Sequence, residues 1–162
     1  YIFLTKSNGG SHLRHLKRFI RNHNPRAEII ECTHRARHLE DVYTQERFDL
    51  SELHNTRVAA ISAIAVPESF ERFLGTLGAT VVYAERFIDH HRYTQQEVID
   101  FLNAAAIRDA EMILTTEKDA VRFPTLNRRD VPIRFLRVEI DILSGEESFN
   151  DCIARLCFLQ TP

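Results

Sequence analysis

Short apolar runs alternate along the chain with segments in which apolar residues recur every three or four positions. The runs are rich in β-branched and aromatic residues, which favour strands, whereas the recurring pattern favours amphipathic helices. The predicted strands cover residues 1–5, 27–32, 57–62, 80–84, 111–115 and 133–140. Strands and helices in alternation imply right-handed βαβ crossovers, and therefore a mostly parallel sheet with helices on both faces.

Four amphipathic helices are predicted between and after these strands. Pro67 opens the second helix and Gly78 closes it. Thr94 and Glu97 form a capping box for the third helix, and residues 144–147 cap the fourth. The side chains expected to face the core are Leu13, Leu16, Phe19, Ile20, Phe70, Phe73, Leu74, Leu77, Val98, Phe101, Leu102, Ala105, Phe149, Cys152, Ile153, Leu156 and Cys157.

These elements predict a single α/β domain over residues 1–162. The expected architecture is a Rossmann-like three-layer α/β/α sandwich, with a mostly parallel sheet of about five or six strands. A chain of 162 residues with 44% hydrophobic and 27% charged residues is long enough to bury a core and typical of a globular protein. Residues 33–56 are polar without a clear period, and we expect them to be irregular.

Charge and cysteine content exclude some classes of protein. The net charge of −2 argues against a general nucleic-acid-binding domain. The first 27 residues hold six cations and no acid, which leaves −8 for the remainder when subtracted from the total of −2. The three cysteines have neither a metal-binding spacing nor an even number for disulfides. No stretch approaches the roughly 18–20 apolar residues of a membrane span. The start at Tyr1, within an apolar run and without Met, indicates a piece of a longer chain.

Polar residues follow four of the predicted strands. They are Thr5 and Lys6, the segment from Ser62 to Pro67, the run Asp89-His90-His91, and the run Thr115-Thr116-Glu117-Lys118-Asp119. Because the carboxyl ends of parallel strands meet at one edge of a sheet, we expect all four groups to lie along that edge, where α/β proteins bind their ligands.

Three interpretations of Asp89, His90 and His91 stay open at this point. A carboxylate beside an imidazole fixes its tautomer and raises its basicity, which suits acid/base chemistry. Imidazole and carboxylate groups are also ligands for divalent metal ions. The third interpretation is an ordinary polar loop, in which Asp89 accepts hydrogen bonds from backbone N–H groups.

The second run begins a helix. Thr116 is its expected cap, and Glu117 and Asp119 favour the positive end of the helix dipole. Lys118 opposes that dipole, so we expect it to meet an acidic partner or a phosphate. Thr115 is expected to turn its hydroxyl toward the ligand crevice.

The first predicted helix is basic. Its cationic face is either simply solvated or contacts an anionic membrane surface or a phosphorylated lipid. The residues concerned are Arg14, Lys17, Arg18 and Arg21. The sequence contains no G-x-x-x-x-G-K-[ST] loop, no G-x-G-x-x-G and no G-x-S-x-G, so it carries no recognisable nucleotide-phosphate loop or nucleophile elbow of its own.

Four ordered motifs resemble the C-terminal half of the tetraacyldisaccharide 4′-kinase family. They are residues 66–70 (Val-Pro-Glu-Ser-Phe), 77–79 (Leu-Gly-Ala), 89–94 (Asp-His-His-Arg-Tyr-Thr) and 115–121 (Thr-Thr-Glu-Lys-Asp-Ala-Val). Residues 3–6 (Phe-Leu-Thr-Lys) are similar to a strand of that family that ends in Thr and a base. The resemblance spans residues 1–140.

The resemblance implies a lipid A pathway kinase that transfers the ATP γ-phosphate to the 4′-hydroxyl of a tetraacyldisaccharide 1-phosphate. It implies a peripheral protein at the cytoplasmic face of the bacterial inner membrane, with two α/β lobes. The P-loop, most contacts to ATP and Mg²⁺ and a membrane-contacting segment belong to an N-terminal lobe that this chain lacks. We therefore expect this C-terminal lobe to be inactive alone and to bind no nucleic acid.

The resemblance also assigns roles to residues. In the family, a histidine after an aspartate in this loop supports a catalytic aspartate of the other lobe, and this role maps onto His90 with Asp89 beside it. Ser62, His91 and residues 115–119 map to the cleft between the lobes. No metal ligand is implied in this lobe.

One departure and two alternatives remain. The family usually has a glycine in the stretch before its Pro-Glu-Ser-Phe motif, where this chain has Ser-Ala-Ile-Ala-Val at residues 62–66, and alanine there, as at Ala63, disfavours a close ligand approach. A metal-dependent phosphoesterase of the DHH type is one alternative, but it needs further acidic ligands, such as an upstream Asp-x-Asp, that the sequence lacks. The other is a non-catalytic α/β module that binds an anionic lipid or a sugar phosphate.

Overall fold

The computed structural model describes the chain except for residues 8–9, 11–12, 127–129 and 159–162. Its contacts group the chain into two compact units. Unit 1 comprises Tyr1–Arg35 and Glu139–Pro162, and unit 2 comprises Ala36–Val138. Two long strands, β2 (Ile29–Asp41) and β7 (Ile133–Ser144), contribute residues to both units. The single domain that the sequence predicts stays a prediction.

The described strands form one seven-stranded sheet. The remaining strands are β1 (Ile2–Leu4), β3 (Arg47–Phe48), β4 (Arg57–Ser62), β5 (Thr80–Arg86) and β6 (Met112–Thr116). The order along the main path is β1-β2-β7-β6-β4-β5, and β3 pairs with β2. The pairs β1–β2, β4–β5, β4–β6 and β6–β7 are parallel, and β2–β3 is antiparallel. The predicted α/β fold with a mostly parallel sheet is confirmed, with six strands on the main path.

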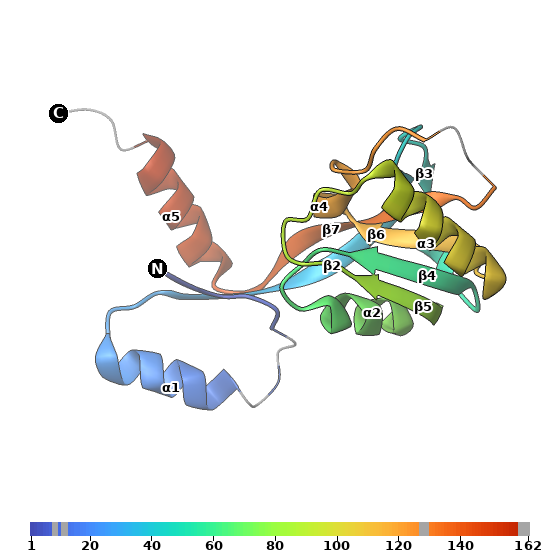
Figure 1. Cartoon of the computed structure of the whole chain (residues 1–162). Helices are drawn as coiled ribbons and strands as arrows, with labels where there is room; N and C mark the ends of the chain where they lie inside the picture. Colours follow the sequence, from blue (N-terminus) through green and yellow to red (C-terminus); the bar gives the residue numbers. More distant parts are fainter. Residues whose placement is uncertain (8–9, 11–12, 127–129, 159–162) are drawn as a thin grey trace. The chain divides into compact units, whose positions relative to one another are not determined.

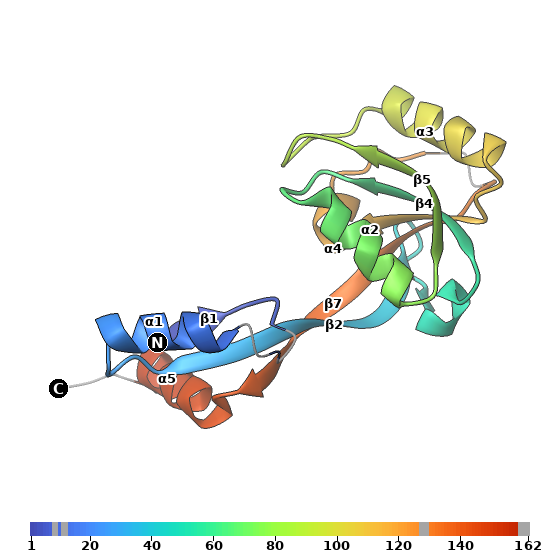
Figure 2. The same ribbon diagram turned by 90° about the horizontal axis from the view of Figure 1, so that it is seen from below.

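Helices cover both faces of the sheet in unit 2 (Figures 1 and 2). The described helices are α1 (Leu13–His23), the 3₁₀ helix η1 (Leu50–Leu53), α2 (Pro67–Thr76), α3 (Gln95–Ile107), α4 (Glu117–Ala120) and α5 (Glu146–Phe158). Phe101 of α3 packs with Ile61 of β4 on one face, and Leu74 of α2 packs with Val58 of β4 on the other. Successive residues of a strand point to opposite faces, so β4 serves both layers. The predicted three-layer sandwich is present in unit 2.

The second and third helices begin as the sequence predicts. Pro67 occupies the first turn of α2. Thr94 caps α3, and its capping box with Glu97 is complete in both directions. All four α3 side chains expected in the core are buried, and Phe70 and Leu74 of α2 are buried as well.

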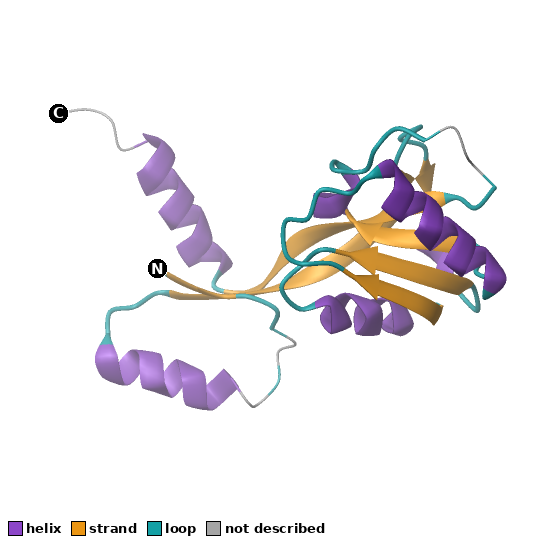
Figure 3. Cartoon of the chain, viewed as in Figure 1, coloured by secondary structure: helices purple, strands orange, loops and turns teal. Residues whose placement is uncertain are grey.

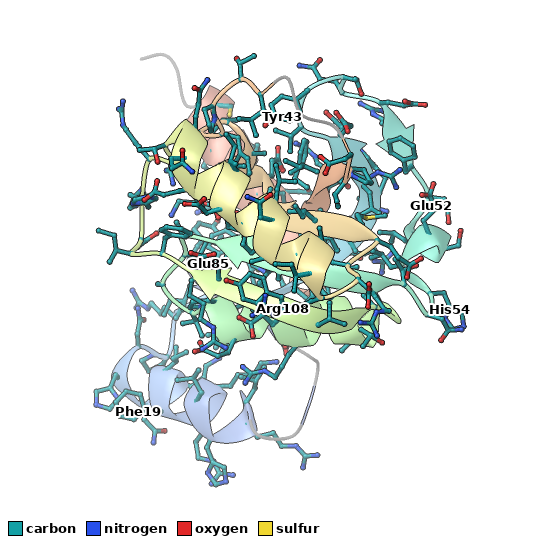
Figure 4. All side chains as sticks on the ribbon, turned by 45° about the vertical axis from the view of Figure 1, so that its right-hand side comes forward. Phe19, Tyr43, Glu52, His54, Glu85 and Arg108 are labelled. Atoms are coloured by element: carbon teal, nitrogen blue, oxygen red, sulfur yellow. The ribbon has the colours of Figure 1, made fainter. Side chains whose placement is uncertain are left out.

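The prediction of buried faces for the first and last helices is wrong within unit 1. No residue of α1 is buried, and Phe19 lies on the outside of the helix with 61% of its surface exposed (Figure 4). In α5 only Cys152 is fully buried among the residues described, whereas Leu156 and Cys157 are exposed. Amphipathic spacing predicts which face of a helix is apolar. In the described part of unit 1, however, the apolar faces of α1 and α5 are left largely uncovered.

The prediction of an irregular segment at 33–56 is also wrong. β2 continues through it to Asp41, and β3 and η1 follow. Arg134 of β7 donates to Glu52 of η1 at 2.6 Å and lies over the ring of Phe48 in β3, 3.4 Å from its centroid. These partners lie about 80 residues apart in sequence, and strand formation here depends on such tertiary pairing rather than on local propensity. Glu52 and the neighbouring His54 are labelled in Figure 4.

Two glycines near the end of α2 provide a stability test. Gly78 has φ +95°, and a Cβ there would lie 3.2 Å from the Cα of His54. A Cβ on Gly75, inside the helix, would meet nothing within 4 Å. We expect Gly78→Ala to lower the free energy of unfolding by about 1–2 kcal/mol, because the left-handed conformation disfavours a side chain.

The matched variant Gly75→Ala should raise the free energy of unfolding by up to about 1 kcal/mol, since alanine is the better helix former. Chemical denaturation of both variants measures the difference. Equal effects of the two substitutions would contradict the assignment of Gly78 as the helix stop.

Candidate functional site

The carboxyl ends of three neighbouring strands meet at one edge of unit 2. Ser62 ends β4, Arg86 ends β5 and Thr116 ends β6. Ser62 and Arg86 are register partners, and β4 also pairs in parallel with β6. The loops that follow these strands emerge on the same side of the sheet (Figure 3). This edge gathers three of the four polar groups that the sequence places there.

The buried carboxylate of Asp119 connects two of these loops. Its side chain is fully buried, and its Oδ2 accepts a hydrogen bond from the backbone N–H of Ala63 at 3.0 Å. The same oxygen accepts from the hydroxyl of Thr116 at 2.7 Å, while Thr116 Oγ1 caps α4 by accepting from Asp119 N–H. The turn after β6 and the loop after β4 are therefore fixed to each other through one side chain.

Arg122 extends this connection to His90. Its Nη1 lies 3.4 Å from Asp119 Oδ1, and its Nη2 lies 3.0 Å from His90 Nδ1. The backbone N–H of His90 also donates to the carbonyl of Ala63 at 3.3 Å. His90 has φ +66°, a left-handed conformation that is uncommon for residues other than glycine and is often found at functional sites. The imidazole is thus held through both its backbone and its ring.

Asp89 lies beside His90 and meets Lys118. Lys118 Nζ donates to Asp89 Oδ1 at 3.0 Å, which confirms the expected acidic partner of this lysine. This hydrogen bond holds the pKa of Asp89 below its usual value. The other carboxylate oxygen is 3.7 Å from His90 Nε2. Since 65% of the His90 side chain and 40% of the Asp89 side chain are exposed, both groups remain accessible at the edge.

His91 belongs to a different cluster. Its Nε2 lies 3.1 Å from Glu97 Oε2, and its ring stacks on Phe87 with centroids 4.6 Å apart. Tyr93 meets both rings edge-on, and burial, followed by the charge of Asp119, raises the pKa of its hydroxyl. The structure therefore gives His91 a structural setting beside the α3 cap, and separates it from the pair Asp89 and His90.

The other predicted site residues take several positions. Ser62 and Thr115 are buried, and Thr115 Oγ1 has no hydrogen-bond partner within the described ranges, so it faces the interior and not an open crevice. Glu117 pairs with Arg137. Ala63 does not adopt a positive φ. Its N–H donates to Asp119 and its carbonyl accepts from the N–H of His90.

Unit 1 holds the remaining predicted residues. Thr5 and Lys6 follow β1, and the basic residues Arg14, Lys17, Arg18 and Arg21 lie on α1. Lys17 is not simply solvated, because it forms an ion pair with the buried Glu31. Arg21 donates to the carbonyl of Pro25 at 3.2 Å. No helix in the described part of the chain has both the length and the apolar character needed to cross a membrane.

Sequence analysis missed Arg122. The motif at residues 115–121 ends one residue before Arg122, although Arg122 lies three residues after Asp119 and therefore on the same side of a helical turn. The signal that points to Arg122 is a cation three residues after an acidic residue in the first turn of a helix. Its contact with His90 joins residues 32 positions apart and has no local signal.

Metal chemistry is not favoured at this edge. Among the described residues, no group of three or more His, Cys, Asp and Glu side chains could hold a metal ion. Lys118 donates to Asp89 Oδ1 and Arg122 contacts His90 Nδ1, so each of these two groups already has a cationic neighbour. The arrangement disfavours the metal-dependent phosphoesterase, since two of its three candidate ligands face cations and the third, His91, lies in a separate cluster.

A polar edge of this kind on a three-layer α/β fold is typical of the large class of enzymes that bind phosphorylated ligands. The family model described as tetraacyldisaccharide-1-P 4′-kinase, LpxK, matches residues 8–157. The chain therefore belongs to the tetraacyldisaccharide-1-P 4′-kinase family.

Relatives agree with this family, and a solved structure has a similar fold. A tetraacyldisaccharide 4′-kinase of Anaeromyxobacter dehalogenans is 38% identical over 127 residues, which cover 77% of this chain and 34% of that protein. One from Syntrophus aciditrophicus is 33% identical over 68% of this chain and 29% of its own length. The crystal structure of LpxK from Aquifex aeolicus in complex with ATP has a similar fold, with a TM-score of 0.51 and 20% identity over 79% of this chain and 36% of that one. The chain thus spans about a third of the length of these proteins.

The contacts of Glu97 predict an acid-dependent loss of stability. The N–H of Thr94, then its hydroxyl and then His91, lower the pKa of Glu97 from 4.5 to about 2. Because the folded-state pKa is below the unfolded value, the stabilisation is present above pH 4.5 and is lost as the pH falls from 4.5 toward 2. We expect Glu97→Gln to be less stable than the wild type at neutral pH, and this difference to disappear across that interval.

Urea unfolding at a series of pH values measures the effect. Glu46→Gln, at an exposed position on the turn before β3, is the matched control and should show no such pH-dependent difference. A constant difference between wild type and Glu97→Gln down to pH 2 would contradict the lowered pKa.

Proposed function

We propose that this chain is the C-terminal lobe of a lipid A pathway kinase that transfers the γ-phosphate of ATP to the 4′-hydroxyl of a tetraacyldisaccharide 1-phosphate. The observation that carries the proposal is the exposed pair Asp89 and His90, held at the carboxyl edge of the sheet by Lys118 and Arg122. This pair lies in one of the four ordered motifs that resemble the family. A second lobe with a phosphate-binding loop would complete the site.

The two residues of the pair have different roles. Asp89 is ionised and bound by Lys118, and its lowered pKa makes it a poor proton acceptor at neutral pH. We assign to Asp89 the role of placing a negative charge beside the imidazole of His90. His90 is the more exposed of the two, and a ring nitrogen at this position can hydrogen-bond to a carboxylate of the second lobe that orients the attacking hydroxyl.

ATP and Mg²⁺ do not fit the residues of this chain alone. The sequence has no P-loop motif, and the described residues offer no set of metal ligands. Bound Mg·ATP supplies the phosphoryl group, and in the proposal the other lobe holds it. Ser62, Thr115, Thr116, Glu117 and Asp119 then support the edge of the cleft from this side, while Lys118 fixes Asp89.

The proposal includes a location. A substrate with four acyl chains resides in a membrane, so we place the kinase as a peripheral protein on the cytoplasmic face of the bacterial inner membrane. The cations of α1 are compatible with a nearby anionic surface, at about 1 kcal/mol per charge close to it. Arg14 and Arg18 are exposed and contribute to this basic face, whereas Lys17 is engaged by Glu31.

A chimera tests the function. In it, this chain replaces the matching segment of the Anaeromyxobacter dehalogenans kinase, and transfer of phosphate to the tetraacyldisaccharide 1-phosphate is measured. We expect the chimera to be active and the isolated 162-residue chain to be inactive. His90→Ala in the chimera should lower kcat by roughly 10²–10⁴, the range for impaired acid/base catalysis, because the carboxylate that orients the attacking hydroxyl loses its partner.

His54→Ala is the control for this substitution. His54 is exposed, follows η1, and forms no hydrogen bond with the described residues of the sheet edge. It should leave kcat unchanged. Unchanged turnover in His90→Ala would remove His90 from the mechanism, and a folded but inactive chimera would contradict the proposed lobe.

A further inference from the structure

Arg122 lies between the buried Asp119 and the exposed His90, and it contacts each through a different guanidinium nitrogen. The Nη1 atom is 3.4 Å from Asp119 Oδ1, and the Nη2 atom is 3.0 Å from His90 Nδ1. Only 22% of the Arg122 side chain is exposed, against 65% for His90. Arg122 therefore joins a fixed group in the interior to an accessible group at the edge.

The contact fixes where the proton of His90 lies. A guanidinium group is always protonated and only donates, so Nδ1 must accept and cannot carry a hydrogen. In the neutral ring the proton is then on Nε2. Protonation of His90 Nδ1 would bring its N–H against the N–H of Arg122 Nη2, and the contact would break.

The Nε2–H group remains available. Its nearest charged neighbour is Asp89 Oδ2 at 3.7 Å, which is beyond hydrogen-bond distance, and the other oxygen of Asp89 accepts from Lys118. A neutral imidazole in this form presents an N–H donor at the open edge. The matching acceptor is an anionic oxygen, such as that of a carboxylate.

We propose that Arg122 is a positioning residue that holds His90 in the Nε2–H tautomer, so that His90 acts as a hydrogen-bond donor to an anionic oxygen and not as the proton acceptor of the reaction. Asp119 anchors Arg122, and Ala63 anchors Asp119 and the backbone of His90. The consequence for turnover rests on the proposed kinase function, whereas the tautomer does not.

The tautomer is measured by ¹⁵N–¹H NMR on the 162-residue chain at mildly alkaline pH. The cross-peak pattern between the ring nitrogens and carbon-bound protons distinguishes the two neutral tautomers. We expect His90 to show one tautomer, with widely separated ring ¹⁵N shifts and the proton on Nε2. A Nδ1–H pattern in the wild type would overturn the proposal.

Two variants separate positioning from folding. Arg122→Met keeps the aliphatic stem but cannot donate, and should move the two ring ¹⁵N shifts of His90 toward each other as the tautomers exchange. Arg122→Lys keeps a cation beside Asp119, and should preserve the fold if Arg122→Met does not. It should still weaken the tautomer preference, because an ammonium lacks the two-nitrogen fork that reaches both groups.

Arg47→Met, on the exposed side of β3, is the matched control and should leave the His90 signals unchanged. If both Arg122 variants fold and the His90 ring shifts stay as in the wild type, the proposal is overturned.

A kinetic cycle in the active chimera tests the consequence. Arg122→Met should lower kcat by roughly 10- to 100-fold with little change in KM, as occurs when a partner that orients a functional histidine is removed. In the His90→Ala background it should cause no further loss, since residues that act through one another are non-additive. An equal loss in both backgrounds would show that Arg122 acts independently of His90. An inactive chimera would defeat the proposed function while leaving the NMR result to decide on Arg122.

Discussion

The buried carboxylate of Asp119 is the interaction on which the candidate site depends. A fully buried carboxylate is costly unless hydrogen bonds and a cation satisfy it, and here the N–H of Ala63, the hydroxyl of Thr116 and the guanidinium of Arg122 do so. These partners come from two loops and a helix end. The hydrogen bonds and the ion pair that satisfy the charge of Asp119 therefore also fix the positions of the loops around Asp89 and His90.

Part of this arrangement follows from sequence. The strands 57–62, 80–84 and 111–115 are nearly correct, because they are short β-branched runs bounded by clear helix signals. The pairing of Lys118 with an acid also follows locally, since a cation in the first helical turn opposes the dipole and needs a partner. Alternation of strand and helix is enough to place three of the four polar groups at one edge.

The remainder depends on contacts that have no local pattern. β2 extends through polar residues because it pairs with β7 and β3, and strand propensity does not report such pairing. Amphipathic spacing gave the apolar sides of α1 and α5 but not what covers them. His91 was grouped with His90 by adjacency, yet the left-handed backbone at His90 sends the two rings to different clusters.

Stability alone does not account for the exposed charges at the edge. Ion pairs as accessible as Lys118 and Asp89 contribute little to stability because solvent screens them, and a left-handed histidine costs free energy. The buried carboxylate of Asp119, by contrast, has its partners in Ala63, Thr116 and Arg122 and does not need His90. An accessible imidazole that the fold holds through both its backbone and its ring, although this costs free energy, is better explained by a functional role than by stability. A donor in this position suits an anionic acceptor, and in the proposed kinase that acceptor comes from the second lobe.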